Sequence, residues 1–368
     1  MSRTNHVDVA ILGAGIGGLS LADHLLTKGV SCAVVDTKSP GSGASGAPLM
    51  LMHPATGRRA KMAWRAEECI DSITQLFSRL TEFSDDHFFE PGHILRPALT
   101  PEIAEDFSRS PEKYDWSDED WVTWLGQSDF TEKYPYFKNN YGGLIVKKAA
   151  TVNGYKFIKL LAEKCEEYGL NTYSNSGYSI NQTKSGWKIT LKSDDEVTAN
   201  NLVFATGSST AESEYWNFLP LNKIKGQTAT FTFSEDLPLQ NSVSSMGYLA
   251  YMKSTPNRIV VGSTYEHHFK HLRPDKKGEE TLIKKLENTL PGWTDKITSV
   301  DQWAAVRVSS QDHNPVVGDH PNHENLFIIG ALGSKGLLMG HYLAKCLADR
   351  ITDGKVIPGE ISTHRYFL

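Results

Sequence analysis

The sequence predicts an α/β protein with two domains, one of them discontinuous. The chain has 368 residues, more than the length at which a single hydrophobic core stops growing. A strand, a glycine turn, a helix and a second strand occupy residues 7–36. Similar segments return near the end of the chain. Between them lies a block of strands with two-residue alternation, a pattern typical of antiparallel sheets, so we expect an inserted α+β domain.

The first unit carries the glycine pattern G-x-G-x-x-G at Gly13, Gly15 and Gly18. In a Rossmann-like domain these glycines allow a tight turn, the approach of a pyrophosphate and close packing of the helix on its strand. Asp36 lies 36 − 13 = 23 positions after Gly13, where a carboxylate can accept from ribose hydroxyls but would repel a 2′-phosphate. The pattern therefore predicts FAD or NAD rather than NADP, bound by Gly13, Gly15, Ile16, Gly17, Gly18, Asp36 and Thr37.

Composition and charge exclude several classes of protein. The chain has 38 basic and 43 acidic residues, a net charge of −5, which does not favour a large phosphate-binding surface. No apolar run is long enough to span a bilayer, and the first strand begins by Val7 without a signal-peptide core. The four cysteines lie far apart and form no metal-binding pattern, so we expect a cytoplasmic protein without a metal site.

A loop rich in glycine and serine follows at residues 37–46. Its small side chains let backbone and hydroxyl groups approach a ligand, so we predict a second phosphate contact from Ala44 and Ser45 rather than a plain flexible loop. The next segment is expected to be a long helix that runs to about Leu80 and has basic residues at its start, namely Arg58, Arg59, Lys61 and Arg65.

Residues 86–141 lose clear periodicity and are dense in aromatic side chains. Such a stripe could stack nucleobases. More often it forms the core of a small domain, which is the interpretation we favour.

The pattern of the first domain then resumes. A helix is expected over residues 153–168, and strands over 170–173, 187–191 and 202–204. Small residues at the carboxyl end of such a strand lie beside a bound nucleotide in open α/β sheets. The cofactor-binding residues predicted in this part are Tyr178, Ala205, Thr206 and Gly207.

The sequence pattern changes in residues 221–303. Strands with alternating apolar and polar residues are expected over 228–233, 248–252 and 259–263, and a helix over 279–290. Because this block is inserted between pieces of the nucleotide domain, we expect it to cover the reactive group.

The last segment predicts a strand over residues 326–330, a glycine turn and a helix over 337–351. A glycine turn that leads into a helix offers N–H groups and a positive field to an anion. A helix that only packs against the core would not need glycines at 330, 333 and 336. The residues predicted to bind the cofactor are Gly333, Ser334, Lys335, Gly336 and Leu337.

Taken together, these motifs resemble the D-amino-acid oxidase superfamily of FAD-dependent amine oxidases, which includes glycine and sarcosine oxidases. The residues that carry the resemblance are the N-terminal fingerprint, the G-A-S-G loop, the A-T-G turn, V-R-V-S-S-Q-D-H-N-P-V-V-G from Val306 and F-I-I-G-A-L-G-S-K-G-L from Phe327. Within the superfamily the sequence is most similar to the oxidase domain of the bifunctional tRNA 5-methylaminomethyl-2-thiouridine biosynthesis proteins, through Ile224-Lys225-Gly226-Gln227 among others. We expect the methyltransferase domain usually fused there to be absent.

The resemblance implies FAD rather than NAD, held without a covalent bond. It implies an FAD-binding domain made of residues 1–86, 145–220 and 304–368, and a substrate domain made of residues 87–144 and 221–303.

The resemblance also implies roles for side chains at the substrate. Arg307 matches the arginine that anchors a substrate carboxylate, and Tyr248 matches a tyrosine that faces the substrate. His53 follows a loop that departs from the relatives' asparagine and glycine, and is the third candidate catalytic residue. Val260 stands near the place where sarcosine oxidases carry an oxygen-activating lysine, which leaves open whether dioxygen is the electron acceptor.

The implied reaction is oxidation of the C–N bond of a primary or secondary amine that bears a carboxylate, by hydride transfer to flavin and hydrolysis of the imine. The alternative is removal of the carboxymethyl group from a carboxymethylaminomethyl-uridine of tRNA. A flavin-binding protein without turnover is a third possibility. The partners implied are a small amino acid or N-substituted glycine, or tRNA, and no membrane; the oligomeric state stays open.

Three further features allow more than one interpretation. Asp312 and His313 can be an acid–base pair or an ordinary loop. Lys335 can lie beside the flavin or point to solvent. The histidines and basic residues of 267–273 can bind metal or phosphate, or form a solvated loop.

Overall fold

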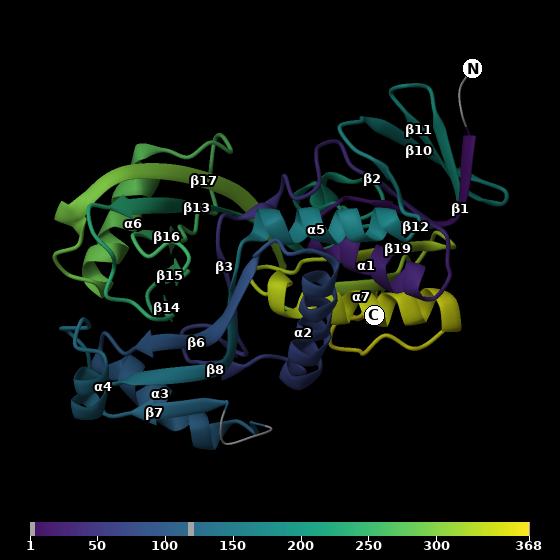
Figure 1. Ribbon diagram of the computed structural model, residues 1–368. Coiled ribbons are helices and arrows are strands. Elements are labelled where there is room, and N and C mark those ends of the chain that lie inside the picture. The colour runs from purple at the N-terminus through teal and green to yellow at the C-terminus, as the bar shows by residue number, and fades with distance from the viewer. Residues whose placement is uncertain (1–3, 117–120, 368) are drawn as a thin grey trace.

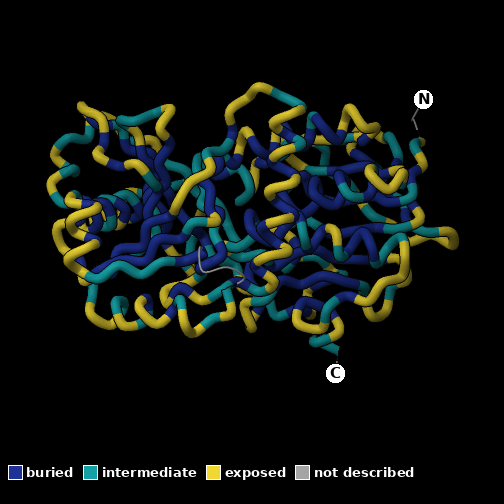
Figure 2. The backbone as a smooth tube through the Cα atoms, turned by 60° about the horizontal axis from the view of Figure 1, so that its bottom comes forward, coloured by how far each residue is buried: buried dark blue, intermediate teal, exposed yellow. Residues whose placement is uncertain are grey.

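The computed structural model describes residues 4–116 and 121–367, which form two large β-sheets at opposite ends of an elongated molecule (Figure 1). We call them sheet A and sheet B. Figure 1 shows sheet A with α1, α5 and α7 on the right and sheet B with α3, α4 and α6 on the left. Buried backbone runs through both halves (Figure 2).

Sheet A has the strand order β10-β11-β12-β1-β2-β9, with β19 beside β12 and β18 beside β19. The strands β1, β2, β9, β12 and β19 run parallel, and β10, β11 and β18 pair antiparallel. The bounds are β1 (Thr4–Leu12), β2 (Cys32–Val35), β9 (Asn171–Tyr173), β10 (Tyr178–Thr183), β11 (Gly186–Leu191), β12 (Glu196–Phe204), β18 (Val316–Asp319) and β19 (Leu326–Gly330).

Alternate side chains of β1 pack in two different core clusters, one on each face of sheet A. Val9 and Ile11 belong to the core cluster that includes side chains of the surrounding helices. Ala10 and Leu12 belong to a second cluster with Trp187, so the strand is buried on both sides. The helices are α1 (Ile16–Thr27), α2 (Ala66–Phe83), α5 (Gly154–Glu167) and α7 (Gly336–Asp353).

Sheet B has the strand order β17-β13-β16-β15-β14-β6-β8-β3, with β7 beside β8. Its longest ladder pairs β13 with β17 antiparallel, from Leu221 opposite Ser310 to Phe233 opposite Ile297. The strands are β3 (Met50–Met52), β6 (Phe89–Pro97), β7 (Val122–Leu125), β8 (Gly143–Val152), β13 (Leu221–Phe233), β14 (Ser242–Ser244), β15 (Tyr248–Tyr251), β16 (Arg258–Gly262) and β17 (Ile297–Ser310).

Three helices belong to this half of the molecule: α3 (Pro101–Lys113), α4 (Gln127–Lys133) and α6 (Lys276–Thr289). Leu282 and Leu286 of α6 pack in one cluster with Phe231 and Val261 of the sheet. The side chain of Asp275 caps α6 by accepting from the N–H of Gly278. The apolar side of the helix therefore packs on sheet B, and its first turn is stabilised by its own cap.

The predicted long helix after residue 58 is wrong at its start. Residues 55–62 form a small hairpin of β4 (Ala55–Thr56) and β5 (Lys61–Met62), and α2 begins only at Ala66. Gly57 in the turn of the hairpin and Arg65 just after it both adopt positive φ, +67° and +44°, which a continuous helix through these residues does not allow. Arg58, Arg59 and Lys61 therefore lie on a hairpin and not on a helix.

The aromatic segment 86–141 behaves as predicted for a core. Phe88, Phe130 and Phe137 are buried, as are Trp121 and Tyr134. These five rings are packed inside the protein and are not available for stacking with bases.

The predicted domain boundaries remain a prediction. Sheet B includes β3, and both β8 and β17 run across a predicted boundary, at 144/145 and 303/304. Among the described residues, no helix combines the length and the apolar character that crossing a membrane requires.

Candidate functional site

The glycine turn after β1 meets the A-T-G turn after β12. Gly13 has a φ of +108°, and its N–H donates to the carbonyl of Val35 at 2.8 Å. A Cβ on Gly13 would lie 2.4 Å from the carbonyl oxygen of Ala205, so only glycine fits here. The carboxyl ends of β1 and β12 thus bring Gly13 together with Ala205, Thr206 and Gly207, where open α/β sheets bind nucleotides.

The side chains of Asp36 and Ser45 both bind backbone of the glycine turn after β1. The Asp36 carboxylate accepts from the N–H groups of Ala14 at 2.7 Å and Lys38 at 2.8 Å. Ser45 Oγ accepts from the N–H of Ile16 at 3.0 Å. Within the described chain, the N–H groups of Gly15, Gly17 and Gly18 have no acceptor, so they are available to an anion. Thr37 is exposed and Ala44 half-buried beside these residues.

The second glycine turn brings another helix N-terminus to the same place. Gly333, with a φ of +55°, donates its N–H to the carbonyl of Val308 at 2.8 Å. A Cβ on Gly336 would lie 3.6 Å from Ile16 Cγ2, and a Cβ on Gly340 would lie 3.3 Å from Ile16 Cγ1. The first turns of α1 and α7 are therefore neighbours, and their dipoles favour negative charge in the same region.

The remaining predicted cofactor residues are placed as follows. Leu337 is buried, Ser334 is exposed, and Lys335 donates from Nζ to the carbonyl of His313 at 2.9 Å. Burial lowers the pKa of Lys335. Burial, followed by the nearby charge of Asp36, raises the pKa of Tyr178 to about 12. Tyr178 therefore lies on the Asp36 side of the turn.

Arg307 is half-buried at the junction between the two sheets. Its Nη2 donates to the carbonyl of Thr264 at 3.2 Å, and its guanidinium lies 4.5 Å from the centre of the Tyr265 ring. A Cβ on Gly226 would lie 2.8 Å from Nη2, so the glycine makes room for the guanidinium. Among the residues described, no carboxylate forms an ion pair with Arg307.

Strand β17 links Arg307 to the cofactor turn. Two residues beyond it, Ser309 forms a bridge with Leu332, and the carbonyl of Val308 holds Gly333. A displacement of the turn that begins α7 would therefore also displace the backbone of Arg307.

Tyr248 also connects the two halves. It starts β15, and its hydroxyl donates to the carbonyl of Leu49 at 3.2 Å, in the loop that follows Ser45. A Cβ on Gly262 would lie 2.4 Å from the Tyr248 ring. Burial raises the pKa of Tyr248, and the charge of Arg307 acts in the opposite direction, so the guanidinium lies near enough to influence the phenol.

His53 lies on the far side of this loop, near a buried arginine. Burial and the charge of Arg96 lower the pKa of His53 to about 3, and its Nδ1 lacks a well-formed hydrogen bond in the described chain. Arg96 donates to the carbonyls of Ala55 at 2.5 Å and Gly57 at 2.6 Å. The imidazole is therefore neutral near pH 7, held in a loop that Arg96 fixes.

The hypothesis of an acid–base pair at Asp312 and His313 is not supported by the geometry. The Asp312 carboxylate accepts from Ser310 Oγ at 2.7 Å and from Arg365 Nε at 2.8 Å. Burial would raise the pKa of Asp312, but these bonds outweigh it and hold the pKa well below its usual range. His313 is exposed and bonds through its backbone.

Sequence patterns missed a set of polar residues on β13 and α6. Lys285 of α6 donates from Nζ to the carbonyl of Ser263 at 2.7 Å. Lys225 is buried and pairs with Glu266 and Asp275, and Gln227 accepts from the N–H of Asp275 at 2.9 Å. The I-K-G-Q motif could have signalled this, because it puts two polar side chains at alternate positions of a strand that is otherwise buried.

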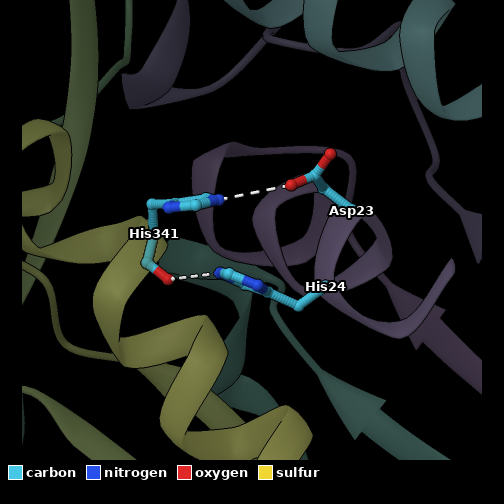
Figure 3. A group of neighbouring side chains, drawn as sticks. All are labelled: Asp23, His24 and His341. Carbon is cyan, nitrogen blue, oxygen red and sulfur yellow. Dashed lines mark hydrogen bonds and ion pairs between the residues drawn. The ribbon is translucent and has the colours of Figure 1, made fainter. Parts of the chain in front are cut away.

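A cluster of Asp23, His24 and His341 lies between α1 and α7, behind the cofactor turn (Figure 3). Their potential ligand atoms lie within 4.8 Å of one another. However, the Asp23 carboxylate already pairs with Arg79 at 2.6 Å and Lys164 at 3.2 Å. Burial would raise the pKa of Asp23, but His341, Arg79 and Lys164 hold it well below its usual range. A carboxylate paired with two cations joins the helices rather than attracting a metal ion.

A surface depression lies beyond Arg307, along the loop that follows β16. It is lined by Lys223, His267, His268, Phe269 and Lys270. Tyr265, whose ring contacts Arg307, begins this loop and is 63% exposed.

Solved structures share the fold along nearly the whole chain. Glycine oxidase from Geobacillus kaustophilus superposes with a TM-score of 0.85 over 96% of both chains at 21% identity. Iminodiacetate oxidase from Chelativorans sp. BNC1 gives a TM-score of 0.79 over 97% of this chain and 98% of that chain at 20% identity. At these identities the likeness shows the fold.

Curated relatives of similar sequence are named tRNA 5-methylaminomethyl-2-thiouridine biosynthesis bifunctional protein MnmC. The protein from Idiomarina loihiensis is 28% identical over 363 residues, covering 95% of this chain and 56% of its own length. The protein from Leptospira interrogans serogroup Icterohaemorrhagiae serovar copenhageni is 25% identical, covering 97% of this chain and 59% of its own. The chain thus spans little more than half the length of these relatives.

The family described as "FAD dependent oxidoreductase", DAO, matches residues 8–350. That range includes both glycine turns, the A-T-G turn, Arg307 and Tyr248. The predicted α/β fold is confirmed. The chain belongs to the DAO family of FAD-dependent oxidoreductases, and is an enzyme that uses FAD.

Proposed function

We propose that the protein oxidises the C–N bond of a small primary or secondary amine that bears a carboxylate, of the glycine or sarcosine class. The observation that carries the proposal is the guanidinium of Arg307. It is half-buried and has no carboxylate partner among the described residues, and its strand leads directly to the glycine turn of α7. A partly buried cation without an anion is suited to bind one from the substrate.

The residues of the cradle fit FAD. The free N–H groups of Gly15, Gly17 and Gly18 and the N-terminus of α7 would hold the pyrophosphate, and Asp36 would accept from the ribose. A Cβ on Gly13 or Gly18 would collide with backbone within 2.4 Å, so the turn has the close approach that a dinucleotide needs. When bound, FAD supplies the oxidant that takes up two electrons from the amine.

The protein's own residues would bind and orient the substrate. The fork of Arg307 can donate two charge-assisted hydrogen bonds to the carboxylate. The half-buried Tyr248 ring would limit the space beside the amine, and the neutral His53 ring would add no positive charge near it. Holding the reacting C–H bond in one position is the main contribution that a protein makes to such a reaction. Two-electron oxidation leaves an imine, which water hydrolyses without a protein nucleophile.

Arg307→Ala tests the proposal. Loss of two hydrogen bonds to a charged group, about 1.5 kcal/mol or more each, should lower kcat/KM for glycine or sarcosine at least about 100-fold. The content of bound flavin should not change. Arg258→Ala is the matched control, because Arg258 is an exposed arginine of the same sheet without a side-chain partner in the described chain. Unchanged kinetics in Arg307→Ala would remove this residue from the carboxylate role.

A second candidate is oxidation of a carboxymethylaminomethyl-uridine in tRNA. It is supported by the names of the curated relatives and by the depression that Lys223, His267, His268, Phe269 and Lys270 line beside Tyr265. The modified group is chemically an N-substituted glycine, so Arg307 would serve this substrate equally well. Lys223 already pairs with Glu212, which leaves fewer free charges for phosphates.

Salt separates the two candidates. Binding to tRNA through phosphate contacts should weaken steeply as salt rises, whereas binding of a small amino acid should change little. No detectable tRNA binding at low salt would exclude the second candidate.

A further inference from the structure

Lys285 is a second cation beside Arg307, and the mechanism above does not use it. Its Nζ donates to the carbonyl of Ser263 at 2.7 Å, and Arg307 Nη2 donates to the carbonyl of Thr264 at 3.2 Å. Two consecutive carbonyls therefore hold two cations that come from different elements, α6 and β17. Their charged ends lie on the same short stretch of backbone after β16.

Neither cation has an acidic partner in the described part of the chain. Lys285 is half-buried, and its pKa is lowered by burial and further by the charges of Arg307 and Arg58. Arg58 is exposed on the hairpin after β4, and it too forms no ion pair with a described residue. Lys285 and Arg307, two half-buried positive charges on consecutive carbonyls with no anion beside them among the described residues, are costly to keep together unless an anionic group binds there.

The backbone leaves room for both cations. A Cβ on Gly247 would lie 2.9 Å from Lys285 Cδ and 3.3 Å from its Nζ. A Cβ on Gly226 would lie 2.8 Å from Arg307 Nη2. The side chain of each cation thus packs against a glycine, and any larger residue at that position would displace the side chain.

Helix α6 is fixed to the strand that carries Gly226. Gln227 accepts from the N–H of Asp275, the residue that caps α6, and Nζ of the buried Lys225 lies 3.3 Å from the Asp275 carboxylate. Lys225 and Gln227 flank Gly226 on β13. The position of Lys285 is therefore set by the same strand that makes space for Arg307.

We propose that Lys285 binds a second carboxylate of the substrate, so that the site prefers N-substituted glycines with two acidic groups over those with one. This rests on the proposed role of Arg307, which would hold the first carboxylate. The chemical class is a small dicarboxylate amine, of which iminodiacetate is the smallest symmetrical member.

Binding of two thioethers to the FAD-loaded enzyme tests this without turnover. Thiodiacetate and (methylthio)acetate have sulfur in place of nitrogen and carry two carboxylates and one. Calorimetric titration of the wild type should show at least tenfold tighter binding of thiodiacetate. Lys285→Met should reduce this preference to less than about threefold, and Lys285→Arg should retain it because it keeps the charge.

Lys284→Met is the matched control, since Lys284 is the exposed neighbour on α6 with no side-chain partner among the described residues; its preference should equal that of the wild type. An equal preference in Lys285→Met and wild type would overturn the proposal. Equal binding of both thioethers by the wild type would also overturn it. If, in addition, Lys285→Met bound tRNA more weakly than the wild type, Lys285 would be a contact for a phosphate of the tRNA backbone.

The same titration separates this proposal from the one on which it rests. Arg307→Ala should lose affinity for both thioethers. If Arg307→Ala bound both as the wild type does, the proposed carboxylate role of Arg307 would fail, whatever Lys285 does.

Discussion

The proposed cofactor cradle and the proposed substrate side of this enzyme are built in different ways. The cradle would use mainly backbone, since Gly13, the N-terminus of α1 and the turn before α7 present N–H groups. The substrate side would use side chains, namely Arg307 on β17, Tyr248 on β15 and Lys285 on α6. A backbone site needs glycine and tolerates little else, whereas a side-chain site needs charges and the space around them. Mutations should therefore act on the two regions through different mechanisms.

The largest effect is expected in the cradle, from Gly13→Ala. The new Cβ would lie 2.4 Å from the Ala205 carbonyl oxygen at a φ of +108°, and neither backbone can give way cheaply. We expect protein that purifies without FAD and does not take it up on reconstitution. The visible absorbance of bound flavin relative to protein absorbance measures this.

Gly17→Ala provides the control for that substitution. Gly17 lies in the same motif, but a Cβ there would meet only Ile329, at 3.6 Å, so this variant should stay yellow. Far-ultraviolet circular dichroism would show whether Gly13→Ala has folded. A folded Gly13→Ala protein with normal FAD affinity would contradict the account of the cradle.

The same difference explains what the sequence can predict. Gly13 and Asp36 lie in one continuous segment, and Gly333 lies in a second glycine turn that leads into a helix, so their spacing alone predicts a dinucleotide site. Lys285 has no such pattern, because its proposed role depends on Ser263 and Gly247, which lie in loops far from it in the sequence. Arg307 and Tyr248 were identified only through the family resemblance, and their roles remain predictions.

Local sequence patterns also explain why the start of the long helix was predicted wrongly. Residues 58–80 have the apolar spacing of a helix from Cys69 onward, and the buried positions Cys69, Ile70, Ile73 and Leu76 fit it. The hairpin before them is set by positive φ at Gly57 and Arg65 and by Arg96, which binds the carbonyls of Ala55 and Gly57 from another strand. A distant arginine that holds backbone carbonyls leaves no trace in the local pattern.

On the substrate side, Gly226→Ala should have an intermediate effect. The Cβ would lie 2.8 Å from Arg307 Nη2, and because this atom ends a flexible side chain, the guanidinium can move while the fold stays intact. We expect normal FAD content and a decrease in kcat/KM of about tenfold, which corresponds to about 1.4 kcal/mol. Steady-state kinetics with the best small substrate measures it.

Gly92→Ala is the matched substitution in the same sheet, since its Cβ would meet only Asn241 Oδ1, at an ordinary 3.7 Å. Its kinetics should equal those of the wild type. If Gly226→Ala were equally silent, the position of Arg307 could not depend on the space above this glycine.

The smallest effect is expected behind the cradle, where His24 packs between α1 and α7. Its Nε2 donates to the carbonyl of His341 at 3.0 Å, and burial, followed by the charge of His341, lowers its pKa to about 3. Between pH 6.5 and about 3 the unfolded chain therefore binds a proton at His24 that the folded protein does not. The free energy of unfolding must then fall as pH falls through this window, by at most about 1.4 kcal/mol per pH unit for one proton.

His24→Gln removes this titration and can still donate to the His341 carbonyl. Urea unfolding at a fixed excess of FAD, from pH 6.5 to 4.5, should show a shallower loss of stability in the variant by up to one proton. Asp23 contributes little to the difference, because its lowered pKa costs stability only below about pH 4. Parallel curves for the two proteins would mean that His24 titrates in the folded state as it does in the unfolded chain. The packing of α1 on α7 would then be more open to water than the half-buried ring and its hydrogen bond to His341 indicate.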